Sequence, residues 1–128
     1  MNIEHLGLNV PDPAAMGDWY VEHLGMVVKL AKDAPVPVRF LADSDGDVMI
    51  EIYRNPAAAV PDYGAMDPLA LHIAFESSDV EGDYARLLAA GGTEHTPPAL
   101  LETGDHLAIL RDPWGVPVQL VRRAEPML

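Results

Sequence analysis

The chain has 128 residues, enough for one domain, with 49% apolar residues and a formal net charge of −12. This acidity disfavours nucleic acids and anionic membranes as partners, and the absence of cysteine excludes disulfides and thiolate metal sites. No apolar run is long enough to span a membrane, and the N-terminus lacks a signal-peptide pattern, so we expect a cytoplasmic protein.

The first half of the chain predicts one strand, one helix and three more strands. Asp12 followed by Pro13 is typical of a helix start, and Gly25 is typical of a helix end. Runs of β-branched and aliphatic residues on both sides of this helix predict strands. The strands are expected at residues 2–10, 25–32, 36–43 and 47–54.

The middle of the chain predicts a linker. Residues 56–67 are rich in proline and alanine and lack the periodicity of a helix or a strand. About a dozen residues is long for a connection between packed units. An extended segment of this length could fold back on its own chain or reach a partner chain.

The second half predicts the same order of elements. A strand is expected at residues 69–77, and Ser78 with Glu81 forms a capping-box pattern before a helix at residues 80–90. The two prolines in residues 93–102 favour an edge strand there. Two histidines flank this segment, His95 and His106; either could line a cleft, but we expect both on the surface. The last strands are expected at residues 106–112 and 116–123.

The two halves repeat one pattern, which indicates a duplicated unit. Three pairs of residues are 67 positions apart and a fourth pair is 68 apart. We therefore predict an α+β fold of two tandem βαβββ modules, residues 1–55 and 68–124, within a single domain of residues 1–128. The pairs are His5 with His72, Asp12 with Asp79, Gly25 with Gly92, and Glu51 with Gln119.

The last of these pairs includes a carboxylate, Glu51, at an unusual position for a charged residue. Glu51 stands between Ile50 and Ile52 in a strand, where an unpaired buried carboxylate costs several kcal/mol. Strand side chains alternate between faces, so the aliphatic residues can cover the helix of each module while polar residues share the opposite face. We expect the two curled mixed sheets to form a shared cleft in which four polar groups converge. These groups are His5, Glu51, His72 and Gln119.

Two imidazoles, one carboxylate and one amide oxygen suit a divalent metal such as Ni, Co, Zn, Mn or Fe(II). Four protein ligands leave coordination positions for water or substrate, as a catalytic metal requires. A single strand histidine is more often structural than a ligand, and a single glutamate more often faces water. Here, however, the polar residues occur at equivalent positions of both halves, and separate structural roles would have to coincide at those positions. This correspondence favours a metal site.

Five short motifs lie along nearly the whole chain. They are "EHLGLNVPDP", "WYVEHLGM", "MIEIYRNP", "LALHIAFES" and "RDPWGVPVQLV". Together they resemble the vicinal oxygen chelate superfamily, which includes glyoxalase I, extradiol dioxygenases and bleomycin-resistance proteins. The resemblance implies paired βαβββ modules that form a cleft, with metal ligands on the first and last strand of each module. The matching positions here are His5, Glu51, His72 and Gln119.

The resemblance is strongest to glyoxalase I, which implies a lyase or isomerase acting on a small α-oxygenated substrate. Glu51 would be the catalytic base, and the metal would stabilise an enediolate. Gln119 departs from the glutamate usual in bacterial members. One alternative is a binding or drug-resistance protein of the bleomycin-resistance type. A ring-cleaving dioxygenase ranks lower, because those enzymes take a carboxylate from the strand that carries Gln119.

The resemblance also implies a homodimer. Some members exchange modules and complete each metal site with residues from two chains. Both an intrachain site and a site shared across the dimer remain open for His5 and His72.

Overall fold

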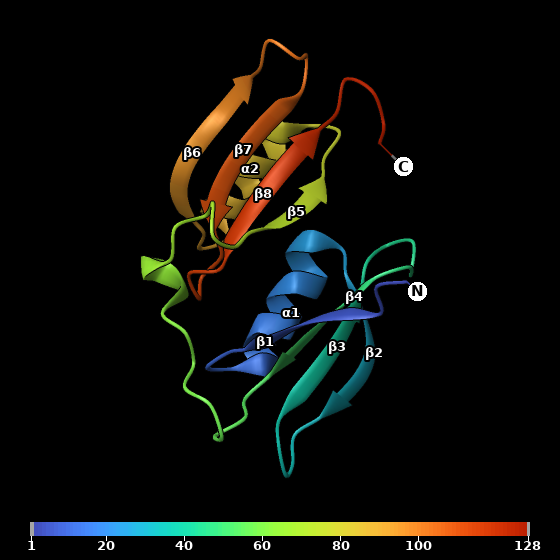
Figure 1. The fold of residues 1–128 in the computed structure, drawn as a ribbon, viewed down its shortest axis with the longest axis vertical. Helices are drawn as coiled ribbons and strands as arrows, with labels where there is room; N and C mark the ends of the chain where they lie inside the picture. The colour runs from blue at the N-terminus through green and yellow to red at the C-terminus, as the bar shows by residue number, and fades with distance from the viewer. Residues whose placement is uncertain (1, 128) are drawn as a thin grey trace. The chain divides into compact units, whose positions relative to one another are not determined.

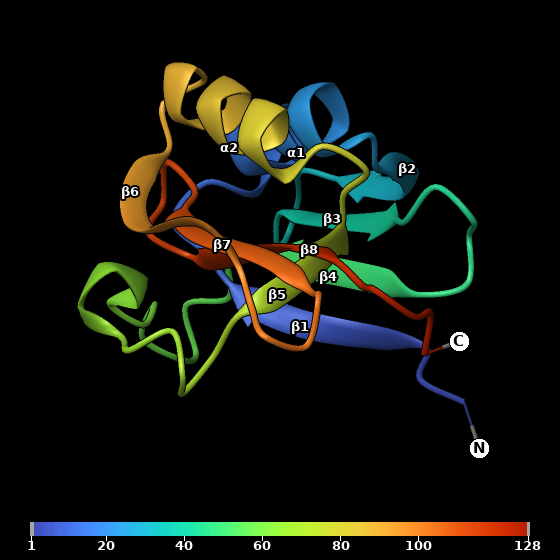
Figure 2. The same ribbon diagram turned by 90° about the horizontal axis from the view of Figure 1, so that it is seen from above.

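The computed structural model describes residues 2–127. The chain divides into two compact units, an N-terminal unit that ends at Pro61 and a C-terminal unit that begins at Asp62 (Figure 1). Each unit consists of a four-stranded mixed sheet with one α-helix on one of its faces (Figure 2). No helix within residues 2–127 has the length and apolar character needed to cross a membrane.

The N-terminal unit has the strand order β1-β4-β3-β2. Strand β1 runs parallel to β4, and the other neighbours are antiparallel. This pairing follows from the βαβββ order, because the helix returns the chain across the sheet whereas hairpins join the later strands. The elements are β1 (His5–Asn9), α1 (Pro13–Leu24), β2 (Val27–Lys32), β3 (Val38–Ala42) and β4 (Met49–Tyr53).

The C-terminal unit repeats this topology with the strand order β5-β8-β7-β6, after a short 3-10 helix, η1 (Tyr63–Ala65). Strand β5 runs parallel to β8, and the other neighbours are antiparallel. The predicted α+β fold of two tandem βαβββ modules is confirmed. The elements are β5 (Ile73–Glu76), α2 (Val80–Ala89), β6 (Thr93–Leu100), β7 (His106–Arg111) and β8 (Pro117–Arg122).

The predicted boundaries of α1 are confirmed. The Asp12 side chain accepts a hydrogen bond from the Ala15 N–H, and Pro13 occupies the first helical position. Gly25 ends the helix with φ 70°, a left-handed conformation that favours glycine.

The predicted start of α2 at residue 80 agrees with the structure, but the predicted capping box is wrong. Asp79, and not Ser78, caps the helix, and its side chain accepts a hydrogen bond from the Gly82 N–H. The helix begins at Val80, so Ser78 lies outside the capping position and cannot form a capping box with Glu81.

Strand β5 is shorter than the predicted strand at residues 69–77. The carbonyl of Asp67 accepts hydrogen bonds from Ala70 N at 2.8 Å and Leu71 N at 3.4 Å, so a turn occupies the first part of this segment. His72 therefore lies immediately before the strand. Strand β6 lies at a sheet edge, as predicted, and shifts in its register around residues 94–99 accommodate the two prolines.

Each hydrophobic core lies between the helix and one face of its sheet. In the N-terminal unit, Met16 and Tyr20 of α1 are fully buried, as are Leu41 and Ile52 of the sheet. The C-terminal unit has the same arrangement. Its fully buried residues include Val80 and Leu87 of α2, and Ala108, Leu110 and Val118 of the sheet. The opposite face of each sheet carries no helix of its own unit, and we call it the helix-free face.

Each end of the segment at residues 56–67 is hydrogen-bonded to the unit that adjoins it in the chain. In the N-terminal unit, the Asn9 side chain donates to the carbonyl of Ala58 at 2.9 Å and accepts from the N–H of Asn55 at 2.9 Å. In the C-terminal unit, Arg111 donates to the carbonyls of Tyr63 at 2.9 Å and Met66 at 2.8 Å. The segment therefore contributes to the structure of both units.

Candidate functional site

Glu51 lies at the centre of the helix-free face of the N-terminal unit. Its strand neighbours Ile50 and Ile52 are 6% and 0% exposed, respectively, and pack on the helix side. The register pairs Glu51 with Gly7 of β1 and with Phe40 of β3. Because directly paired residues share a face, these three residues form a row across the sheet.

His5 lies beside this row. It precedes Gly7 by two residues and therefore points to the same face. Its Nε2 atom is 3.3 Å from Oε2 of Glu51, and its ring meets the Phe40 ring edge-on with centroids 5.4 Å apart. The structure thus brings one predicted pair of site residues, His5 and Glu51, into direct contact.

The second ring nitrogen of His5, Nδ1, is held by the carboxylate of Glu4. This hydrogen bond raises the pKa of His5, as do the charges of Glu4 and Glu51, and together they outweigh the opposing effect of desolvation. A carboxylate on Nδ1 is a common way to orient a histidine that binds a metal through Nε2. In that tautomer, Nε2 of His5 and Oε2 of Glu51 are two adjacent donor atoms.

The C-terminal unit places its predicted residues in the same pattern. Gln119 pairs with Ala74 of β5 and Ile109 of β7, and His72 precedes Ala74 by two residues. Gln119 is half-buried, whereas Val118 and Leu120 beside it are buried on the helix side. His72 and Gln119 therefore occupy the positions that His5 and Glu51 occupy in the other unit.

His72 is also held through Nδ1. The carbonyl oxygen of Pro68, in the turn before β5, is 2.8 Å from this atom and accepts a hydrogen bond from it when Nδ1 is protonated. The contact leaves Nε2 as the ring atom that could bind a cation. In both candidate ligands, an oxygen atom from a residue earlier in the chain therefore orients the imidazole.

The donor types fit a borderline divalent cation. Each unit supplies one imidazole together with one side-chain oxygen, from Glu51 or Gln119, and these atoms match Zn, Ni, Co, Mn or Fe(II). Over residues 2–127, no three His, Asp or Glu side chains form a group that could hold a metal ion. The candidate ligands thus occur as two pairs, one in each unit.

His106 was expected on the surface, and this prediction is wrong. It is 7% exposed and faces α2, where its Nε2 lies 3.1 Å from Oε1 of Glu81. Its position two residues before Ala108 in β7 puts it on the buried face, and this alternation was the signal available in the sequence. His95 is exposed, as expected.

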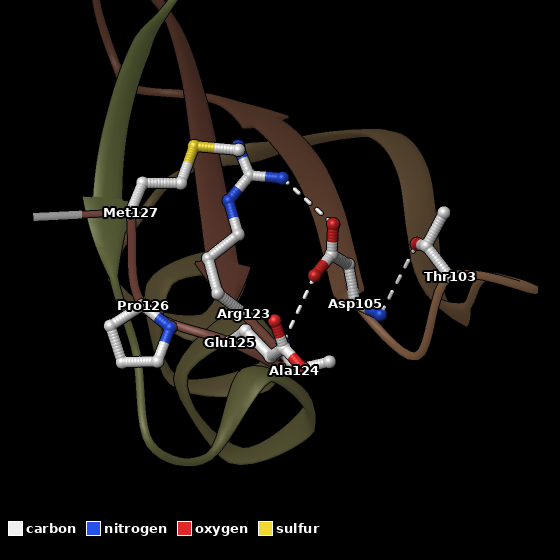
Figure 3. A pocket seen from close by; sticks show the side chains of 7 residues that line it. All are labelled: Thr103, Asp105, Arg123, Ala124, Glu125, Pro126 and Met127. Atoms are coloured by element: carbon white, nitrogen blue, oxygen red, sulfur yellow. Dashed lines mark hydrogen bonds and ion pairs between the residues drawn. The ribbon is translucent and has the colours of Figure 1, made fainter.

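A pocket of the C-terminal unit, near the end of the chain, is lined by none of these residues (Figure 3). Two of its charged groups, Arg123 and Asp105, are paired with each other: Arg123 donates to Asp105 at 2.8 Å, and the Ala124 N–H also donates to Asp105 at 3.0 Å. These bonds lower the pKa of Asp105, with the backbone hydrogen bond the larger cause. The arrangement stabilises the chain end.

The family model described as "Glyoxalase/Bleomycin resistance protein/Dioxygenase superfamily" matches residues 2–120. The chain belongs to this superfamily. The match includes the four residues His5, Glu51, His72 and Gln119, and it agrees with the resemblance seen in the sequence motifs. No curated protein matched the chain at a significant level.

Solved structures of the glyoxalase superfamily and related proteins share the fold. Glyoxalase I from Zea mays is 23% identical with a TM-score of 0.77, over 97% of this chain and 45% of the maize chain. The protein SMU.1112c is 27% identical with a TM-score of 0.74, over 95% and 98% of the two chains. TnmS3, an antibiotic binding protein from Streptomyces sp. CB03234, is 19% identical with a TM-score of 0.74, over 97% of both chains. The chain spans less than half the length of the maize enzyme.

Proposed function

We propose that this protein is a metal-dependent lyase or isomerase of the glyoxalase I type, acting on a small α-oxygenated substrate. The contact between His5 and Glu51 is the observation that carries the proposal, because it places an imidazole nitrogen and a carboxylate oxygen 3.3 Å apart. The same positions in the C-terminal unit hold His72 and Gln119. Superfamily membership supports this proposal.

In this proposal, His5, Glu51, His72 and Gln119 together hold one divalent cation. The cation would supply positive charge that favours proton loss from the carbon next to the oxygens of the substrate. Glu4 and Pro68 orient the two imidazoles through their Nδ1 atoms. The metal is Ni, Co, Zn, Mn or Fe(II), all of which suit these ligands.

Glu51 is the proposed base. One of its oxygens accepts the proton from the substrate carbon, and the electron pair of the broken C–H bond forms the double bond of an enediolate. Glu51 then returns the proton to the neighbouring carbon, so the conversion needs no oxidant or reductant. The Glu51 side chain is 24% exposed and lies beside Phe40, and such partial shielding from water favours proton transfer.

A second candidate function is small-molecule binding, as in a drug-resistance protein. The similarity to TnmS3 over 97% of both chains favours it, because the maize enzyme matches this chain over only 45% of its own length. A ring-cleaving dioxygenase is a weaker candidate, because β8 carries the amide of Gln119 where those enzymes have a carboxylate.

Metal content and proton exchange separate these candidates. Protein purified without chelators should contain one divalent metal ion per chain, measured by elemental analysis. The loaded protein should catalyse exchange of the hydroxymethyl hydrogens of hydroxyacetone with D₂O, followed by proton NMR against free metal as the control. A protein without metal or exchange that binds an antibiotic stoichiometrically would instead support the binding function.

We further propose that the protein forms a homodimer. Each sheet has edge strands whose backbone groups can pair with another chain, and β1 and β2 are the edges of the N-terminal sheet. Light scattering at micromolar concentration should give twice the mass of the chain. A monomer under these conditions would contradict this proposal and leave the proposed chemistry in place.

A further inference from the structure

The segment that joins the two units is held by hydrogen bonds on both sides of a short stretch. On the N-terminal side, the Asn9 side chain donates to the carbonyls of Ala58 at 2.9 Å and Ala59 at 3.5 Å. On the C-terminal side, Asp62 accepts from the Ala65 N–H, through its carbonyl at 3.2 Å and its side chain at 3.1 Å. Each held part of the segment therefore belongs to one unit.

Two residues, Val60 and Pro61, lie between these contacts. Within residues 2–127, no hydrogen bond joins either of them to another part of the chain. The boundary between the two compact units falls directly after Pro61. The predicted linker at residues 56–67 thus contains an untied connection of only two residues, which spans at most about 7 Å.

Pro61 also limits how this connection can bend. Its ring fixes its own φ, and its bulk restricts the preceding residue, Val60, to extended conformations. Only a few backbone torsions remain free between the two held parts. Residues of this kind act as hinges, because changes in a few torsions turn two rigid units relative to each other.

The contacts on both sides of this connection lead to the strands that carry the candidate ligands. Asn9 belongs to β1, the strand that begins with His5. Arg111 of β7 donates to the short helix η1 at 2.9 Å and pairs with Pro117, two residues before Gln119 in β8. A change of torsion between the two held parts therefore turns one ligand-bearing strand relative to the other.

We propose that Val60 and Pro61 form a hinge, and that rotation about this hinge brings the two ligand pairs of one chain onto one cation. This inference rests on the proposed function, in which each unit supplies one imidazole and one side-chain oxygen. Once the first pair holds the cation, binding of the second pair is intramolecular. The short connection then gives the second pair a high effective concentration.

The first test lengthens the hinge. Insertion of six glycine and serine residues between Val60 and Pro61 increases the untied length fourfold. Because effective concentration falls roughly as the −3/2 power of length, zinc affinity should fall by about eightfold. Calorimetry on protein stripped of metal measures the affinity, and thermal unfolding shows that both units remain folded.

The matched control has the same insertion between Ala57 and Ala58. The Asn9 side chain donates to the carbonyls of Asn55 at 3.2 Å and Ala58 at 2.9 Å, on the two sides of this point. These bonds hold both ends of the enlarged loop on the N-terminal unit, so the hinge keeps its length. The control should bind zinc with wild-type affinity.

The second test measures the rotation itself. The chain has no cysteine, so Glu22→Cys in α1 and Glu102→Cys before β7 accept one spin label on each unit. Both positions are exposed. Excess unlabelled chain leaves one labelled chain in any oligomer, and pulsed electron paramagnetic resonance measures the distance between its labels. Zinc should narrow the distribution of this distance.

Each other outcome overturns a defined part of this inference. Wild-type zinc affinity in the hinge insertion would show that the hinge does not govern assembly of the site. An equal loss of affinity in the control would assign the effect to the whole linker. A distance distribution that zinc leaves unchanged would show that the units do not rotate. If the wild type binds no zinc, the proposed function itself fails, and the hinge loses its role with it.

Discussion

The two units of this protein share one topology and one strand register, yet their helix-free faces differ. Around Glu51, the N-terminal unit has Gly7, Phe40 and Tyr53. The equivalent residues around Gln119 are aliphatic. They are Ala74, Ile109 and Val121. The candidate ligand positions thus correspond in the two units, whereas the residues beside them differ.

The polar residues at the centres of the two helix-free faces also differ. Glu51 is a carboxylate that can both bind a cation and accept a proton, whereas the Gln119 amide can only bind. The N-terminal unit also has Gly7 beside Glu51, whereas the C-terminal unit has the methyl group of Ala74 beside Gln119. We expect the N-terminal unit to perform the chemistry, and the C-terminal unit to contribute metal ligands.

The largest expected effect is the loss of metal binding when either histidine is replaced, and it should be equal for the two units. His5→Ala and His72→Ala should each abolish stoichiometric metal binding while the fold is retained, because neither side chain packs in a core. Gln119→Ala should weaken binding less, since a neutral amide interacts less strongly with a cation. Elemental analysis measures the result, and full metal content in His72→Ala would contradict the equivalence.

The second largest effect should distinguish the catalytic roles of the two units. Glu51→Gln should slow hydroxyacetone exchange by about a hundredfold or more, the usual contribution of a general base. A double variant, Glu51→Gln with Gln119→Glu, restores the original set of metal ligands but moves the carboxylate to the C-terminal unit. It should bind metal and remain inactive. Recovery of exchange in the double variant would show that the units are interchangeable.

Mixing variants tests which units combine in one site. If dimers exchange modules, His5→Ala and His72→Ala chains that pair at random should regain about a quarter of the metal sites. Each mixed dimer would then have one site with both histidines and one with neither. Sites formed within single chains should regain none, which metal analysis of the mixture would show. Each variant alone serves as the control.

The smallest expected effect is a difference between the two units in stability at low pH. Burial alone would raise the pKa of Asp83, but hydrogen bonds from Ser77 and Arg86 lower it below its usual value. The C-terminal unit should therefore lose stability as the pH falls from the ordinary carboxylate pKa toward the lower value in the folded state. The raised pKa of His5 stabilises the N-terminal unit at low pH and does not offset this loss.

Two tryptophans can report this difference, because Trp19 lies in the N-terminal unit and Trp114 in the C-terminal unit. In variants that keep one tryptophan each, acid titration followed by fluorescence should unfold the Trp114 reporter at the higher pH. An Asp83→Asn control should remove part of the difference. Coincident transitions would show that the units unfold together.

The sequence by itself determined the duplication, the order of the elements and the polar face of each module. These features depend on local periodicity and capping, as at Asp12 and Gly25, and such signals act over a few residues. The repeat offset then related Glu51 to Gln119 without any knowledge of their neighbours. The same local rules misplaced the α2 cap and His106, where two patterns competed within a short segment.

Only the tertiary structure decided which side chains meet. The parallel pairing of β1 with β4 joins residues far apart in the chain, such as His5 and Met49, and so brings His5 to Glu51. Register depends on backbone hydrogen bonds between distant strands, and a shift of one residue would turn every side chain to the opposite face.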